Sequence, residues 1–288
     1  MTAESAYRLV QLANGTYSVH ALRERETFHP VIGPVAEAEA LYVRQLRLPE
    51  RAARQTGELV IWDVGLGSAA NTLTVLRALQ PATCPVRIIS FDHTLQPLEF
   101  GLTHAAELGY YGGYEAPITR LLQDHQVQFT DGCHAVHWEA RLGDFPSFVR
   151  SPVARTLPAP HAILFDAYSP ARNPEMWTLP LFQCVYQLLD PARPCGMPTY
   201  SRSTLLRVTL LLAGFYVGAG HATGEKEETT IAANSLDLID EPLDHAWLQR
   251  VKRSTSAEPL HEPVYRQTRL SADNWDKLLQ HPQFHEAL

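Results

Sequence analysis

Residues 59–69, with the sequence LVIWDVGLGSA, decide the fold that we predict for this chain. The stretch begins with apolar residues typical of a buried strand and leads directly into the pattern Asp63, Gly65, Gly67. The two glycines permit a tight turn and a close approach of the backbone to a ligand. Residues 70–79 then continue with helical spacing. A glycine pair alone is weak evidence, but strand, glycine turn and helix in this order predict a nucleotide-binding unit.

Carboxylates follow four predicted strands: Asp63, Asp92, Asp144 and Asp166. Ligands bind outside the carboxyl ends of the strands in an open α/β sheet. Asp92 lies about one βαβ unit after the glycines, where an acid can bind both ribose hydroxyls of a nucleoside. Each acid alone could instead cap a helix. Four unrelated caps at four successive strand ends are the less favoured account.

The remaining chain predicts an α/β fold, because strands and helices alternate in a way typical of a parallel sheet. We expect a hairpin over residues 7–21 around Asn14-Gly15, the strongest short hairpin signal, and another hairpin before residue 135. The expected strands of the sheet are 58–63, 86–91, 135–142, 161–166, 197–201, 215–217 and 229–233. The expected helices are 35–46, broken by residues 48–51, then 70–79, 95–109, 117–124, 178–189, 203–212 and a weak one in 272–288.

We expect an N-terminal hairpin and helix extension over residues 1–56, a Rossmann-like domain over 57–234, and a C-terminal extension over 235–288 that packs on it. The formal charge of −7 gives no overall positive field for nucleic acid or anionic membrane. No apolar stretch approaches the ~20 residues that span a bilayer, and no signal peptide is evident. We therefore expect a cytoplasmic protein. The four cysteines have no paired spacing, and the histidines form no recognisable ligand set, so we expect no metal.

The stretch after Phe165, residues 166–178 with the sequence DAYSPARNPEMWT, carries the chemistry. A strand ends in the carboxylate of Asp166, beside an aromatic ring and a loop that turns at two prolines. An acid held in this way is a candidate for handling a proton or binding a cation. The alternative is that Asp166 only caps a turn, and that Tyr168 only packs.

This stretch resembles the run D-[GA]-[FY]-[SA]-P-[AK]-[KR]-N-P-[ED]-M-W of the MnmC family, in the part that acts as a tRNA methyltransferase. The family completes 5-methylaminomethyl-2-thiouridine at the tRNA wobble position. The resemblance covers about two thirds of the chain, including residues 63–73, with weaker traces at Phe28-His29 and Glu37-Ala38. The third glycine of the loop is replaced by Ala69, and residues 226–229 depart from the family's basic segment. We expect a single-domain form without the FAD-dependent oxidase half, which would act separately and upstream.

The resemblance implies a class I S-adenosyl-L-methionine (SAM)-dependent methyltransferase fold, in which the last strand of the sheet is antiparallel. It also implies an N-methyltransferase that acts on an aminomethyl-uridine of tRNA. Asp166 would orient the amine and accept its proton, and Tyr168 would line the site or meet the sulfonium by cation–π attraction. SAM would be bound by Asp63, Gly65, Gly67, Asn71, Asp92, Asp144 and Asp166. Substrate would be bound by Pro170, Arg172 and Lys226.

Two alternatives remain open from the sequence. The first is methyl or aminopropyl transfer to a small amine, because spermidine synthases share this sheet and place an acid after the fourth strand. Their D-x-x-D loop is not matched, since Asp166 is followed by Ala, Tyr and Ser. The second is a non-catalytic module that binds SAM or tRNA. Such a module should lose the acid or the glycines, and this chain keeps both.

Overall fold

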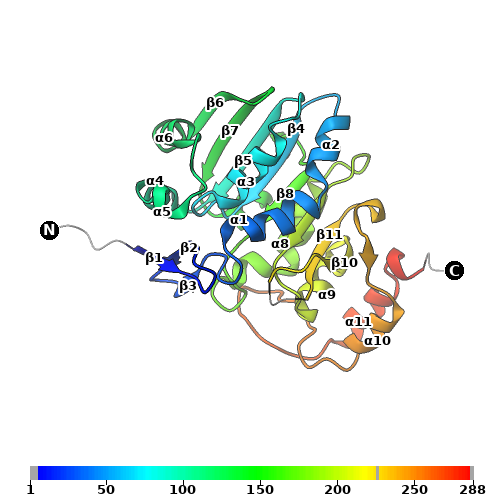
Figure 1. Cartoon of the computed structure of the whole chain (residues 1–288). Coiled ribbons are helices and arrows are strands. Elements are labelled where there is room, and N and C mark those ends of the chain that lie inside the picture. Colours follow the sequence, from blue (N-terminus) through cyan, green and yellow to red (C-terminus); the bar gives the residue numbers. More distant parts are fainter. Residues whose placement is uncertain (1–5, 225–226, 286–288) are drawn as a thin grey trace.

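The computed structural model describes residues 6–224 and 227–285 (Figure 1). A nine-stranded sheet has the order β12-β10-β11-β9-β8-β4-β5-β7-β6. Its strands are β4 (Leu59–Val64), β5 (Val86–Asp92), β6 (Gln126–Asp131), β7 (His134–Leu142), β8 (Ala162–Phe165), β9 (Gly196–Thr199), β10 (Tyr216–Gly220), β11 (Thr229–Ala233) and β12 (Glu241–Pro242). Every strand predicted for the core is confirmed, with shifts of one or two residues at most ends.

The five central strands β7, β5, β4, β8 and β9 run parallel. Strand β11 lies antiparallel between β9 and β10, as the sequence predicts. The edge strand β6 is the first arm of the predicted hairpin with β7. In this order, β4 is central, and its carboxyl end lies between those of β5 and β8. The glycine turn after β4 and the acids after β5 and β8 are therefore brought to one edge of the sheet.

Side chains alternate along each strand and feed two separate apolar cores, one on each face of the sheet. Leu59 and Ile61 point into the first core, whereas Val60 and Trp62 point into the second. This alternation has the period of two that a pleated strand imposes. Because both faces are covered, the central strands read as continuous apolar runs rather than as alternating patterns.

The helices cover both faces (Figure 1). The α-helices are α1 (Pro34–Ala38), α2 (Leu48–Arg54), α3 (Ala70–Leu79), α4 (Gln96–Thr103), α5 (Ala105–Leu108), α6 (Glu115–Asp124), α7 (Phe145–Arg150), α8 (Leu179–Gln187), α9 (Thr204–Ala213), α10 (His245–Val251) and α11 (Ala272–Leu279). Other helical elements are the π-helical η1 (Glu39–Arg44) and the 3₁₀ turns η2 (Pro152–Thr156), η3 (Pro174–Trp177), η4 (Leu236–Leu238) and η5 (Pro282–Phe284).

Three expectations about helices are corrected. Residues 48–51 are not merely a break: α2 begins there, and the interruption is Arg47, whose φ of 49° lies in the left-handed region. Residues 95–109 form two helices, α4 and α5, with a break at His104. The C-terminal extension was predicted to hold one weak helix in 272–288, but it also contains α10, in which Trp247, Leu248 and Val251 are buried.

The N-terminal hairpin is confirmed. Strands β1 (Tyr7–Gln11) and β2 (Tyr17–Ala21) pair antiparallel, and β3 (Glu26–Thr27) extends them into a small separate sheet. This small sheet lies near α4 and α5, apart from the main sheet (Figure 1). In the part of the chain that the structure describes, no helix is both long enough and apolar enough to cross a membrane.

Candidate active site

A cleft of about 1140 Å³ opens at the carboxyl ends of β4, β5 and β8. Its floor includes the glycine turn after β4, and one wall is the loop that begins at Asp166. The opposite wall comes from the N-terminal segment, where residues 23–30 and Glu37 line it. The cleft is therefore shared between the main sheet and the small N-terminal sheet.

The glycine turn is held in a conformation that requires glycine. Gly65 has a φ of 91°, and a Cβ there would lie 2.5 Å from the backbone oxygen of Asp166. Gly67 has a φ of 51°, and a Cβ there would lie 3.3 Å from the ring of Phe28. Ala69, which replaces the third glycine, adopts a φ of 61° and precedes the first turn of α3. The turn is thus compatible with alanine at this position, at the cost of a left-handed residue.

Asp63 lies beneath the cleft rather than on its wall. Only 1% of the residue is exposed, and its Oδ2 accepts hydrogen bonds of 2.8 Å from the hydroxyls of Thr72 and Ser90. Burial raises the pKa of Asp63 to about 7. The two hydroxyls lower this pKa, and the carboxylates of Asp166 and Asp92 raise it further. Asp63 therefore joins β4 to α3 and β5, and its contacts stabilise the turn from below.

Asp92 does line the cleft. Its Oδ2 accepts a hydrogen bond of 3.0 Å from the backbone N–H of Gly67, which holds the glycine turn against the end of β5. Burial raises the pKa of Asp92, opposed by the backbone N–H donors of Gly67, Thr94 and His93. Asp144 is placed differently. It caps α7 through a 2.8 Å hydrogen bond from the backbone N–H of Ser147. Its neighbours Gly143 and Phe145 line the cleft, but Asp144 is not among the lining residues.

Asp166 lines the cleft. Its backbone N–H donates to the carbonyl of Val64 at 2.9 Å, so the sheet fixes the position of the Cα atom. Its Oδ2 accepts a hydrogen bond of 2.8 Å from the side-chain amide of Asn71, which lies on the first turn of α3. The same oxygen lies 3.5 Å from Nε2 of His29. The structure therefore brings together Asp166, Asn71 and the glycine turn, as the sequence predicts.

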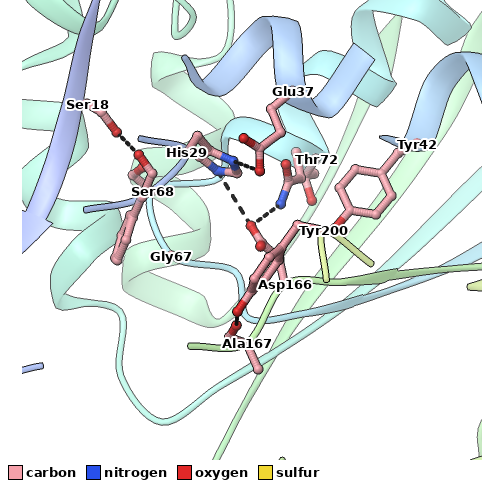
Figure 2. A network of polar contacts seen from close by, with 12 residues as sticks. Ser18, His29, Glu37, Tyr42, Gly67, Ser68, Thr72, Asp166, Ala167 and Tyr200 are labelled. Atoms are coloured by element: carbon pink, nitrogen blue, oxygen red, sulfur yellow. Dashed lines mark hydrogen bonds and ion pairs between the residues drawn. The ribbon is translucent and has the colours of Figure 1, made fainter. Parts of the chain in front are cut away.

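His29 and Glu37 were identified in the sequence only as weak family traces, without a role. Figure 2 shows the His29 ring between Glu37 and Asp166. Both residues are buried, with 8% and 5% exposed. Burial alone would lower the pKa of His29, but the carboxylates of Asp166 and Glu37 outweigh it and raise the pKa to about 9. Neither spacing nor local pattern links a histidine near the N-terminus to the end of β8.

The loop after Asp166 is fixed at both sides. The indole N–H of Trp177 donates to the carbonyl of Tyr168 at 2.7 Å, and Trp177 is buried. On the other side, the backbone N–H of Ser169 donates to Glu26 of β3 at 3.1 Å, and its hydroxyl bonds to the same carboxylate. The ring of Tyr168 lines the cleft and lies 5.9 Å from that of Phe28. Burial raises the pKa of Tyr168, which keeps its hydroxyl neutral.

The structure describes two of the three predicted substrate residues. Arg172 is exposed and lines the cleft. Pro170 is half-buried in the same loop, although it is not among the lining residues. Lys226 lies outside the described residues. Arg207 is 4% exposed and binds Thr229, Thr230 and Glu228, so it is not available to a phosphate.

The expectation about metals was based on spacing, and within residues 6–224 and 227–285 no group of three or more His, Cys, Asp or Glu could hold a metal ion. The four cysteines are free thiols, two of them buried.

Comparisons with known proteins give the class. Residues 118–235 match a family described as S-adenosyl-L-methionine-dependent methyltransferase. The chain is 28% identical over 232 residues to the tRNA 5-methylaminomethyl-2-thiouridine biosynthesis bifunctional protein MnmC of Methylibium petroleiphilum, which covers 77% of this chain and 34% of that protein. The protein of the same name from Aeromonas salmonicida is 26% identical over 209 residues, 67% of this chain and 30% of that protein. The chain thus spans about a third of the length of these curated relatives.

Two solved structures share the fold. The crystal structure of MnmC2 from Aquifex aeolicus superposes with a TM-score of 0.70 and 22% identity, covering 97% of this chain and 84% of that one. A spermidine synthase superposes with a TM-score of 0.54 and 11% identity, covering 94% and 84%. At these identities the likeness shows the fold.

The sheet order, the glycine turn and the family match together define the protein as a SAM-dependent methyltransferase of the class I, Rossmann-like fold. Within that class, the chain is similar to about a third of the length of the MnmC proteins. Its cofactor is SAM. The cleft fits this group, because the positions where a Cβ would obstruct the turn are glycines and a carboxylate ends β5 beside them.

Proposed function

We propose that this protein transfers the methyl group of SAM to the aminomethyl group of a 5-aminomethyl-(2-thio)uridine at the wobble position of tRNA. The names of the MnmC relatives support the substrate, because they place those proteins in the biosynthesis of this nucleoside in tRNA. The observation that carries the chemistry is Asp166, a carboxylate fixed by the sheet on the wall of the cleft and bonded to Asn71.

The charges of the cleft favour a cationic substrate. Among the residues that the structure describes, six carboxylates and three arginines line it, and with His29 protonated the lining carries a formal excess of two negative charges. The carboxylates belong to Glu24, Glu26, Glu37, Asp92, Asp166 and Glu175. A primary alkylamine is protonated at neutral pH, and SAM also carries a positive sulfonium. Opposite charge in an enclosed site attracts both, which suits an amine substrate better than an anionic one.

SAM when bound supplies an electrophilic methyl group, so the protein has little activation to provide. The amine must lose a proton before its lone pair can attack, and we assign this proton to Asp166. The N–C bond forms as the C–S bond breaks, and the positive charge of the sulfonium passes to the new amine. Holding the two groups in line supplies much of the rate. Tyr168 and Phe28 enclose the site as an aromatic wall.

We assign the SAM contacts as follows. The backbone at Gly65 and Gly67 would approach the methionine part, and Asp92 would bind the ribose hydroxyls. Asn71 and Asp166 would face the methyl group from α3 and β8. Asp63 would act from beneath the turn, through Thr72 and Ser90. Asp144 would reach the adenine amine only if its capping bond to Ser147 is shared or released.

Phosphate contacts would come from exposed basic residues near the cleft. Arg172 lies on its rim, and Arg202 follows the cleft residue Tyr200 in the chain. Arg250 lies on α10, and both Arg202 and Arg250 are near enough to Arg207 to lower its pKa, after the larger effect of burial. We infer a local basic surface rather than a global one, since the formal charge is −7.

The partners follow from this reaction. The free aminomethyl group would be supplied upstream by an oxidase activity, as the resemblance to the bifunctional relatives implies, and tRNA as substrate implies a cytoplasmic enzyme. We further propose that the extension before residue 57 covers the site, that residues 57–234 bind SAM, and that residues 235–288 pack on the core.

The test is methyl transfer from labelled SAM to tRNA isolated from a strain that lacks this protein. Nucleoside mass spectrometry should locate the methyl group on the aminomethyl-uridine. Binding of tRNA should weaken steeply with salt, because phosphate contacts release counterions. Free polyamines are the competing acceptors. Transfer to polyamines but not to tRNA would favour the small-amine alternative. Binding of tRNA without any transfer would favour a non-catalytic module.

A further inference from the structure

Glu26 of β3 makes a contact across the cleft that the proposed reaction does not use. Its Oε2 accepts a hydrogen bond of 3.1 Å from the backbone N–H of Ser169, and its Oε1 accepts another from the hydroxyl of the same residue. Glu26 and Ser169 come from opposite walls of the cleft, so the walls meet at this point. The carboxylate therefore joins the small N-terminal sheet to the loop that begins at Asp166.

Ser169 is a junction within this loop. Its carbonyl accepts hydrogen bonds of 2.8 and 2.9 Å from the backbone N–H groups of residues 172 and 173, which form a turn. The preceding residue, Tyr168, is held from the side of the core, because its carbonyl accepts the indole N–H of Trp177. Glu26 binds Ser169 from the side of the small sheet. A shift of Ser169 would therefore move both Tyr168 and the turn.

The chain that follows Glu26 packs on the same loop and on the glycine turn. The ring of Phe28 lies 5.9 Å from the ring of Tyr168. It is also the group nearest to the position of a Cβ on Gly67, at 3.3 Å. The backbone carbonyl of Phe28 accepts a hydrogen bond from the hydroxyl of the buried Ser18 on β2. Phe28 is thus fixed to the small sheet by a contact that does not involve Glu26.

The position of Glu26 suits a role in geometry rather than in proton transfer. Both of its carboxylate oxygens are bound to Ser169. Asp166 lies three residues before Ser169, and its backbone N–H is bound to the carbonyl of Val64. The segment from Asp166 to Ser169 is therefore held at both ends, by the main sheet and by Glu26. A displacement of about 1 Å at a reacting group can reduce the rate on the order of 100-fold.

We propose that Glu26 is a positioning residue for methyl transfer. By holding Ser169, it sets the separation of Phe28 and Tyr168 and keeps Asp166 in place beside the glycine turn. This inference rests on the proposed function only for the methyl acceptor that its first test uses. Glu26 takes no part in the bonds that form and break, and the proton of the amine still passes to Asp166.

The first experiment compares kcat for methyl transfer to tRNA in Glu26→Ala and Glu26→Gln. Alanine removes both hydrogen bonds, so kcat should fall by about tenfold or more. Glutamine keeps both contacts, because its amide oxygen can accept from the N–H and its amide nitrogen can donate to the hydroxyl, so kcat should stay within about threefold of the wild-type value. An equal loss in both variants would assign the effect to the negative charge and overturn the proposal.

Stability and SAM affinity separate positioning from a purely structural role. The contact is half-buried, and a single hydrogen-bonded contact contributes modestly to the stability of a whole protein. The melting temperature of Glu26→Ala should therefore stay close to that of the wild type. Its affinity for SAM in calorimetry should change less than kcat, because Phe28 remains fixed by Ser18. A lower melting temperature with an unchanged kcat would show a purely structural role and overturn the proposal.

A double-mutant cycle tests whether Glu26 acts through Ser169. Ser169→Ala removes the hydroxyl bond but keeps the N–H bond, so its loss in kcat should be the smaller one. The double variant should lose no more than Glu26→Ala, because both changes remove the same contact. Fully additive losses would overturn the proposal. Gln11→Ala is the matched control: Gln11 is exposed on β1 of the same small sheet, and its Nε2 donates to the carbonyl of Gly15 at 3.3 Å. Its kcat should equal that of the wild type, and a loss as large as in Glu26→Ala would contradict the proposal.

The second experiment needs no methyl acceptor, so it separates this inference from the tRNA assignment. Amide hydrogen exchange is followed by mass spectrometry in peptides that cover residues 166–173. These peptides should exchange faster in Glu26→Ala than in the wild type, and at the wild-type rate in Glu26→Gln, whereas peptides of β5 should not change. Unchanged exchange in Glu26→Ala would overturn the proposal even if tRNA is methylated. Faster exchange in this variant, with a wild-type protein that transfers no methyl group, would count against the proposed function alone.

Discussion

Gly65 offers the sharpest test of how the glycine turn and the loop that begins at Asp166 depend on each other. We predict that Gly65→Ala destabilises the protein and reduces turnover more than it reduces SAM affinity. A Cβ at this position would lie 2.5 Å from the backbone oxygen of Asp166, 3.0 Å from its carbonyl carbon and 3.4 Å from the nitrogen of Ala167. All three atoms belong to the backbone, so no side chain can rotate away. The end of β8, and Asp166 with it, must move.

The expected magnitude has two parts. The φ of 91° is strained for alanine, which costs about 1–2 kcal/mol. Insertion of a methyl group into a packed site costs about 1–3 kcal/mol more. At roughly 2–4 °C for each kcal/mol, the melting temperature should fall by about 4–20 °C. Turnover should fall by more than the loss of folded protein explains. A displacement of Asp166 by about 1 Å can reduce the rate on the order of 100-fold.

Gly113→Ala is the matched control, because Gly113 has the same φ of 91° and nothing within 4 Å of the position of its Cβ. This variant carries the conformational strain without the contact. Thermal denaturation, SAM calorimetry and methyl transfer should be compared for both variants. If Gly65→Ala loses no more stability than Gly113→Ala and turns over at the wild-type rate, then the turn does not press on Asp166 and the reasoning is wrong.

Three further predictions concern carboxylates. In Asp166→Asn, the hydrogen bond to Asn71 can still form, but the proton acceptor is lost. The value of kcat should fall by about 10²–10⁴-fold, with the affinity for SAM nearly unchanged. Full activity of this variant would remove Asp166 from the mechanism. Asp92→Ala should weaken SAM binding by about 1–3 kcal/mol in calorimetry, because the N–H of Gly67 loses its acceptor as well; tighter binding of NAD than of SAM would end this assignment. In the folded state the pKa of Asp63 is about 7, which lies above its value in the unfolded chain. The folded state therefore keeps a proton that the unfolded chain releases, and the free energy of unfolding falls as pH rises from about 4 to about 7. This decrease is up to about 4 kcal/mol. In Asp63→Asn, the unfolding free energy measured over the same pH range should decrease less. An equal decrease in the variant would show that Asp63 does not titrate in this range.

The strands and the glycine turn could be predicted because their signals are local. A strand buried on both faces has a continuous apolar sequence, as at residues 59–62. Gly65 and Gly67 indicate a sharp turn, because glycine adopts left-handed backbone conformations without strain. The antiparallel direction of β11 was predicted from the family resemblance and not from a local signal. Helix boundaries were predicted less well. The break at Arg47 depends on a left-handed residue without a glycine to signal it, and α10 depends on apolar residues that only the tertiary fold brings to the core.

The sequence by itself determined which acids follow the strands, and hence that these carboxylates would meet at one edge of the sheet. It did not determine what each acid does, because a carboxylate at a strand end can bind a ligand, cap a helix or brace a turn. The fold separated these cases: Asp92 and Asp166 line the cleft, Asp144 caps α7, and Asp63 lies beneath the turn. Only the tertiary structure brought His29 and Glu37 to Asp166, because this contact depends on how the N-terminal extension docks on the sheet, and docking leaves no periodic signal in the chain.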